Sequence, residues 1–271
     1  MQSNKSILVI GIIIVVLLGG GVWYFSNSHK AATETSTPVT ATASPTPEAT
    51  PPDHFPVPDE EAEQQSARSS AKTITKLPNL DESDETLKEE LSKIADSSKL
   101  EDLVIFKNLI RSMVVFVDNL STSRLSKITS PLNQPEGDFK VSTDGTMSPE
   151  NYSRYTPYVE LAESVDLKKL RHMYVHFYPL FQKAYADLGN SRYFNDHLIS
   201  TIDLLLTTPT PKGPLHMNKL VVTYEFTDPD LEKLSIGQKI LIRMGPENED
   251  NCKKILKNLR GVLAHLKQEI K

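Results

Sequence analysis

Cysteine is nearly absent from the chain, because Cys252 is the single one among 271 residues. One cysteine excludes an intramolecular disulfide, a CxxCH haem attachment and a cysteine-rich zinc site. It also excludes a lipid attached just after the N-terminal apolar stretch, since no cysteine lies there. The sequence also lacks an HExxH motif, a GxSxG motif and a phosphate-binding glycine loop. We therefore expect no cofactor, and no motif assigns a reaction.

An excess of positive charge is missing as well. The chain carries 30 Lys and Arg against 35 Asp and Glu, which gives a formal net charge of −5. Nucleic-acid binding requires a concentrated basic surface that attracts phosphates. We therefore expect no nucleic-acid partner.

One long apolar stretch is present near the N-terminus, at residues 7–25. As a helix it would be about 28 Å long, close to the hydrocarbon thickness of a bilayer, roughly 30 Å. Its length and the bulky Trp23, Tyr24 and Phe25 at its end favour an uncleaved anchor over the alternative, a cleaved signal peptide. The cations around it favour a cytoplasmic N-terminus. The predicted location is the bacterial inner (cytoplasmic) membrane, with a single pass and a periplasmic C-terminal domain.

The remainder divides into a linker and a domain. The division predicted is a short tail at 1–6, the transmembrane helix at 7–25, a linker at 26–76 and a folded domain at 77–271. The linker is rich in Pro, Thr and Ser and has little apolar area to offset chain entropy, which predicts disorder with polyproline character.

Apolar periodicity predicts a mainly α domain, a helical bundle-like arrangement with a minor β element. Residues 100–120 are apolar nearly all round, which is typical of a central buried helix, with a break indicated near Lys107. Ser98 and Glu101 have the spacing of a capping box at a helix start. Two short strands are predicted, at residues 139–142 beside an Asp-Gly turn and at residues 220–226.

Several stretches resemble a known family. They are Leu77–Asp84, Phe116–Leu120, Asn151–Tyr155, Tyr178–Gly189 and Leu241–Asn248. In this order they are similar to a family of bacterial, single-span, membrane-anchored proteins known only as a domain of unknown function, number three thousand and fourteen of that series. The likeness covers about residues 77–260. It implies a bacterial source and an anchored topology, and it supplies no catalytic residues.

The candidate ligand-binding residues are two arginines, two tyrosines and one acid: Arg154, Tyr155, Tyr178, Asp203 and Arg243. Arginine presents a planar fork that suits carboxylate or phosphate, and buried tyrosine hydroxyls need partners. The alternative is a buried ion-pair network that fixes helix register, with Asp118, Asp166 or Asp203 as the counter-ion. Asp203 stands among apolar neighbours, so it is either paired or has a raised pKa.

A metal site is the weaker hypothesis. His172 and His176 are four residues apart and share a helical face, with Glu163 or His197 as a third ligand. The aromatic residues around them favour core packing, so we expect no metal and no catalytic residue here.

Two functions remain open. The first is a non-enzymatic interaction or scaffold module of the bacterial envelope, anchored in the lipid bilayer through residues 7–25 and bound to an envelope protein or a cell-wall component. The second is a small-ligand or cell-wall-glycan binder, or a hydrolase, that uses an Arg/Tyr/Asp pocket. The sequence favours the first and therefore a chain that is not an enzyme.

Overall fold

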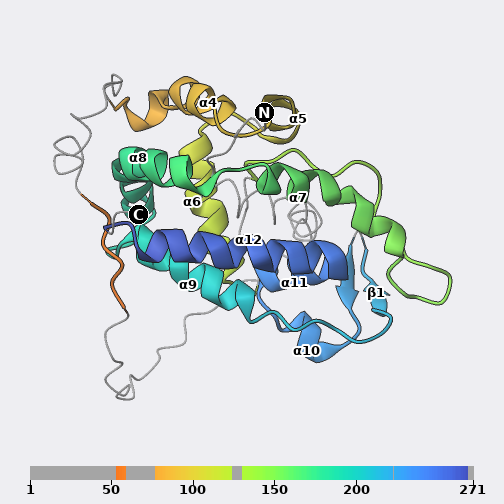
Figure 1. The fold of residues 1–271 in the computed structure, drawn as a ribbon. Helices are drawn as coiled ribbons and strands as arrows, with labels where there is room; N and C mark the ends of the chain where they lie inside the picture. Colours follow the sequence, from red (N-terminus) through yellow and green to blue (C-terminus); the bar gives the residue numbers. More distant parts are fainter. Residues whose placement is uncertain (1–52, 59–76, 124–129, 222, 268–271) are drawn as a thin grey trace, which may run out of the picture.

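A computed structural model describes residues 53–58, 77–123, 130–221 and 223–267. These residues form a mainly helical domain with one small two-stranded sheet, as the sequence predicts (Figure 1). The predicted transmembrane helix at 7–25 lies outside the described residues. Within the described ranges, no helix combines the length and the apolar character needed to cross a bilayer.

The elements follow one another from residue 80 to residue 264. They are η2 (Leu80–Glu82), α4 (Asp84–Ser92), α5 (Ser97–Leu103), α6 (Leu109–Leu120), η3 (Pro149–Arg154), α7 (Thr156–Glu163), α8 (Leu167–Asp187), α9 (Phe194–Leu206), β1 (Met217–Lys219), β2 (Tyr224–Phe226), α10 (Pro229–Glu232), α11 (Ile236–Arg243) and α12 (Pro246–Ala264).

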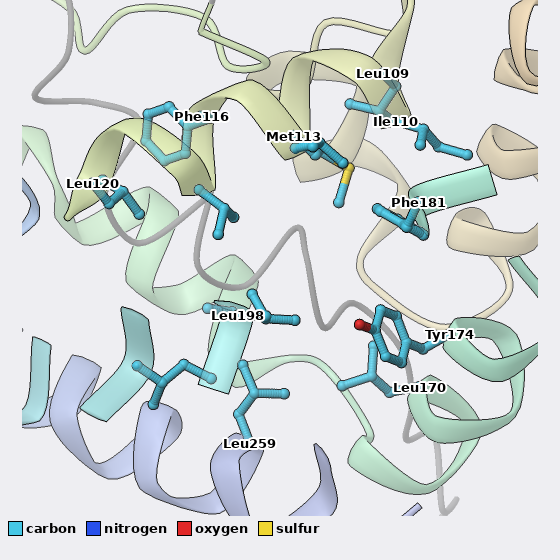
Figure 2. Packing of buried hydrophobic residues seen from close by; sticks show 14 of the residues in the cluster. Leu109, Ile110, Met113, Phe116, Leu120, Leu170, Tyr174, Phe181, Leu198 and Leu259 are labelled. Atoms are coloured by element: carbon cyan, nitrogen blue, oxygen red, sulfur yellow. The ribbon is translucent and has the colours of Figure 1, made fainter. Parts of the chain in front are cut away.

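Helix α6 lies at the centre of the core. It packs against α8, α9 and α11, and its buried side chains come from nearly every side of the helix. Figure 2 shows Met113 of α6 directed toward Phe181 of α8, and Phe116 and Leu198 belong to the same buried cluster. Helix α12 runs along α9 and also contacts α7 and α8, so it covers the core from the other side (Figure 1). The prediction of a central buried helix is confirmed for residues 109–120.

The predicted break near Lys107 is also present, because α5 ends at Leu103 and α6 begins at Leu109. Asn108 between them has φ of 50°, a left-handed conformation that asparagine tolerates. The Asp84 carboxylate at the start of α4 accepts hydrogen bonds from the backbone N–H groups of Asn108, at 2.6 Å, and Leu109, at 2.9 Å. A negative group from another helix therefore caps the positive end of α6.

The capping box predicted at Ser98 and Glu101 is wrong. Helix α5 begins at Ser97, and the side chain of Asp96 accepts from the N–H groups of Ser98 and Lys99. Aspartate is as good an N-cap as serine, and Asp96 stands two residues before Ser98. Elsewhere Ser235 and Gln238 do form a capping box at the start of α11.

The β predictions are correct in kind and wrong in extent. Residues 220–226 were expected to form one strand, but β2 covers only Tyr224–Phe226 and pairs antiparallel with β1. Leu220 belongs to the turn between the two strands, where its N–H donates to the Thr223 carbonyl. Residues 139–142 contribute only the isolated bridge from Val141 to Met147. Alternation alone does not separate a strand from the turn that leads into it.

Gly237 allows α11 to approach α6 and α9. A Cβ atom at this position would lie 2.5 Å from Leu205 Cδ2 and 3.2 Å from the Leu120 carbonyl oxygen. We expect Gly237→Ala to lower the free energy of unfolding by roughly 1–3 kcal/mol through overpacking. Unfolding by denaturant, monitored by circular dichroism, measures this change in the free energy of unfolding.

Gly261 provides the matched control, since it also lies in a helix but a Cβ there would meet nothing within 4 Å. Gly261→Ala should stabilise the protein by about 0.5–1 kcal/mol because alanine is the better helix former. Equal effects of the two substitutions would contradict the packing described for Gly237.

Cys252 is fully buried, and burial raises the pKa of its thiol far above the ordinary value. The thiolate is the reactive form. We expect a maleimide reagent to leave the native protein unlabelled at pH 7.5 and to label it once in 6 M guanidinium. Rapid labelling of the folded protein, measured by mass spectrometry, would contradict this placement.

Candidate functional site

Residues 53–58, inside the predicted linker, lie against the domain at the start of α9 (Figure 1, orange). The Phe55 N–H donates to Asp196 Oδ1 at 2.8 Å, and Asn195 Nδ2 donates to the Phe55 carbonyl at 2.8 Å. His54 Nδ1 lies 2.9 Å from Asp196 Oδ2. These six residues of the predicted linker thus contact the domain, and the remainder of the linker, at 26–52 and 59–76, lies outside the described residues.

Side chains add apolar and aromatic contacts. The rings of His54 and Tyr193 have centroids 4.4 Å apart, and the guanidinium carbon of Arg260 lies 5.9 Å from the centroid of the Phe55 ring. Phe55 and Val57 are half-buried and pack against the main core. We name Tyr193, Asn195, Asp196 and Arg260 together the α9 docking surface.

Asn195 is held in one orientation by its neighbours. It is fully buried, and its Oδ1 accepts a hydrogen bond from the Tyr174 hydroxyl at 3.2 Å. With Oδ1 so engaged, the amide nitrogen faces the Phe55 carbonyl. A buried amide donor without an acceptor costs about 1–3 kcal/mol. The domain is therefore built to receive a carbonyl at this point.

Gln182 of α8 fixes the start of α9. Its Oε1 accepts from the Tyr178 hydroxyl, at 3.0 Å, and from the Phe194 N–H, at 2.8 Å, while its Nε2 donates to the Arg192 carbonyl at 3.0 Å. Burial raises the pKa of Tyr178 to about 12, and its hydroxyl is protonated at neutral pH and can donate to Gln182. These bonds hold the first turn of α9, and with it the two residues that contact Phe55.

Asp203 and Arg260 form a bidentate ion pair between α9 and α12. Arg260 donates from Nε to one carboxylate oxygen of Asp203 and from Nη2 to the other, the latter at 3.0 Å. The Asp203 hydrogen bond is the main cause that raises the pKa of Arg260, and the negative charge of Asp53 adds to it. The pair holds the guanidinium group near the Phe55 ring.

Arg154, Tyr155 and Arg243 belong to another part of the domain. Arg154 donates to three loop carbonyls, those of Pro135 at 3.4 Å, Glu136 at 2.9 Å and Gly137 at 2.7 Å. Burial raises the pKa of Tyr155, and the positive charges of Arg154 and Arg243 act in the opposite direction.

Arg243 is buried and connects α11 to the hairpin. It donates from Nη2 to the Tyr224 carbonyl at 3.1 Å, and its guanidinium carbon lies 4.7 Å from the centroid of the Phe226 ring. A guanidinium at this distance from an aromatic face is attracted to it.

The five predicted ligand-binding residues thus divide into two groups. The first group, Arg154, Tyr155 and Arg243, lies near the start of α12. In the second group, Asp203 contacts Arg260, which belongs to the last turns of α12. Tyr178, also of the second group, lies beside the first turn of α9. The sequence analysis missed Asn195, Gln182 and Arg260. The one available signal was Phe55, the only aromatic residue between positions 31 and 76.

The three histidines considered as metal ligands lie in different environments. His172 is exposed, and His176 packs edge-on against Phe177 with centroids 5.0 Å apart. His197 stacks on Tyr185, and its Nε2 lies 3.4 Å from Asp118 Oδ1. Among the residues that the structure describes, no three His, Cys, Asp or Glu side chains are grouped so that they could hold a metal ion.

The protein is thus a mainly helical domain that binds residues 53–58 of its own chain. Comparison of its sequence with known families identifies the family. Residues 109–260, from the first residue of α6 to Arg260, match the family described as "Protein of unknown function (DUF3014)". The chain belongs to this family, as the resemblance noted from its sequence predicted. Comparison with curated proteins and with solved structures found no match.

His197 gives a pH-dependent stability. Burial lowers its pKa below the ordinary value of 6.5, and Asp118 opposes this shift. Below about pH 6.5 the unfolded chain binds a proton that the folded chain does not, so stability is lost as the pH falls. We expect the free energy of unfolding to decrease from pH 7.5 to pH 5.5, and His197→Gln to flatten that decrease.

The control for this prediction is His172→Gln, which removes an exposed histidine from α8. It should leave the pH dependence of urea unfolding unchanged. If His197→Gln and the wild-type chain lose the same stability over this pH range, the burial of a neutral imidazole is refuted.

Proposed function

We propose that this protein is a non-enzymatic interaction module of the bacterial cell envelope, tethered to the inner membrane through residues 7–25. The observation that carries the proposal is the α9 docking surface, which holds an extended segment through both main-chain groups of Phe55. Holding a peptide by its main chain is a general way in which domains bind other proteins.

The environment of the predicted pocket residues agrees with an interaction module. The Arg154 guanidinium donates to three carbonyls of its own chain, and Asp203 is paired with Arg260. Groups engaged in this way stabilise the fold and position other side chains. A hydrolase or glycan site would instead need them directed together toward a common substrate.

The membrane tether is supported by the sequence. The uncharged stretch at 7–25 has the length of a bilayer span, and residues 26–52 separate it from the docked segment. In this arrangement the domain lies in the periplasm, where its partner would be an envelope protein or a cell-wall component.

Fractionation of cells that express the full chain with a C-terminal tag tests the tether. We expect the full chain to stay with membranes after alkaline carbonate extraction and to be released by detergent. Deletion of residues 7–25 should release it to the soluble fraction. Protease added to spheroplasts should digest the domain only if it is periplasmic.

The opposite outcome is equally clear. A mature wild-type chain that is soluble and lacks its first thirty residues would show that the apolar stretch is a cleaved signal. A domain protected from protease in intact spheroplasts but digested after lysis would reverse the proposed orientation.

A further inference from the structure

The segment at 53–58 makes its contacts largely through features that another peptide could provide. Two of its three hydrogen bonds use the N–H and the carbonyl of Phe55, which every peptide except one with proline at that position possesses. The third joins the His54 ring to Asp196. The contacts thus require an extended main chain at one residue and rings on that residue and the one before it.

Proline makes the segment suited to this form of binding. Phe55 is followed by Pro56, and Val57 by Pro58, so every second position in this stretch lacks an N–H. Such a segment cannot form a regular strand ladder, and its proline rings favour an extended backbone already in the free state. Less conformational entropy is then lost on binding than for a flexible peptide.

The domain side of the contact is fixed independently of the segment. Tyr174 orients the buried Asn195 amide, Gln182 holds the first turn of α9, and Asp203 holds Arg260. All three bonds join parts of the domain itself. The α9 docking surface is therefore preorganised, and loss of the segment would leave the Asn195 donor and the Asp196 carboxylate without their peptide partners.

We infer that the α9 docking surface is a peptide-binding site for extended, proline-flanked aromatic segments of a partner protein, and that residues 53–58 occupy it in cis as a displaceable ligand. This inference rests on the proposed function, since it names the class of ligand that the interaction module takes. A segment tethered to its own site has an effective concentration of about 1 mM. If the cis segment binds its site with an intrinsic Kd of about 100 μM, any competing peptide would then bind the wild-type chain roughly tenfold more weakly than a chain without the cis segment.

A labelled peptide tests the inference on the full chain in detergent micelles. The probe is the ten-residue peptide Pro-Pro-Asp-His-Phe-Pro-Val-Pro-Asp-Glu, residues 51–60, with an N-terminal fluorophore. Binding is measured by fluorescence anisotropy to three proteins: wild type, Phe55→Ala, and a chain with residues 53–58 replaced by Gly and Ser. We expect the Gly/Ser chain to bind the probe about tenfold more tightly than wild type, and Phe55→Ala to bind it more tightly by a smaller factor, because that variant loses the ring but keeps the main-chain hydrogen bonds.

Two controls isolate the contacts. On the protein, a Gly/Ser replacement of equal length at residues 38–43 leaves the segment intact and should behave as wild type. On the peptide, N-methylation of the Phe amide removes the N–H that donates to Asp196, without any change in the protein. It should weaken binding at least tenfold, as should a scrambled peptide of the same composition.

Several results would overturn the inference. One is the absence of probe binding to the Gly/Ser chain while its melting curve matches wild type. Equal binding to wild type and to that chain would exclude cis competition, and binding unaffected by N-methylation would exclude the main-chain contact. Wild-type dimers that disappear on Gly/Ser replacement would assign the segment to a second copy. Each of these results leaves the membrane fractionation unaffected, so the tether and the peptide site can fail separately.

Discussion

The burial of helix α6 is the constraint on which the domain depends. Its apolar side chains face α8, α9 and α11 together, and each large side chain removed from water contributes about 1.5–3 kcal/mol. The first N–H groups of a helix have no partner within the helix, and at the start of α6 the Asp84 carboxylate of α4 accepts from two of the backbone N–H groups there. At the other end, the Thr122 carbonyl just beyond α6 accepts from the Ile236 N–H at the start of α11. Its two ends are therefore joined to elements distant in sequence.

The position of α9 follows from the same packing. Its apolar face contacts α6 and α12, which leaves its first turn at the edge of the core. There the buried Phe194 ring stacks on Phe181, and the hydrogen bonds of Gln182 add polar contacts that position the turn. The α9 docking surface combines an apolar border, against which Phe55 and Val57 pack, with two polar side chains held at fixed angles. Rigid elements that present a few oriented polar groups bind more selectively than mobile loops.

Periodicity was sufficient to predict most helices, because the burial of one face is a local property of the sequence. The central helix and its break near Lys107 were predicted in this way. The family was predicted separately, from five stretches that match it in the same order. The choice between two nearby cap residues was not predicted in this way, since Asp96 and Ser98 have similar capping energies. The extent of the hairpin depends on which residues form its turn, and the alternation of apolar and polar residues does not specify where the turn ends and the strand begins.

The candidate site was harder to predict for a different reason. Its residues come from positions 53–58, 182, 193–196 and 260, and no local pattern joins them. Tyr178 and Asp203 were selected as a tyrosine and an acid in unusual settings, and both lie beside the site as supports for other groups. Arg154 and Arg243 were selected for their charge, and in the structure Arg154 donates to a loop carbonyl and Arg243 to a carbonyl of the hairpin. Composition identifies unusual residues, whereas only the fold shows which of them meet.

The docked segment also determines where mechanical load enters the molecule. A pull on the chain from the N-terminal side reaches Phe55 before it reaches α4, because the covalent path passes through residues 53–58 first. Three hydrogen bonds and two half-buried side chains would break there while the helical core stays intact. Release of the segment would then add the residues between Pro58 and Leu77 to the length of the linker. Tension applied from the N-terminal side would therefore load this contact before it loads the helical core.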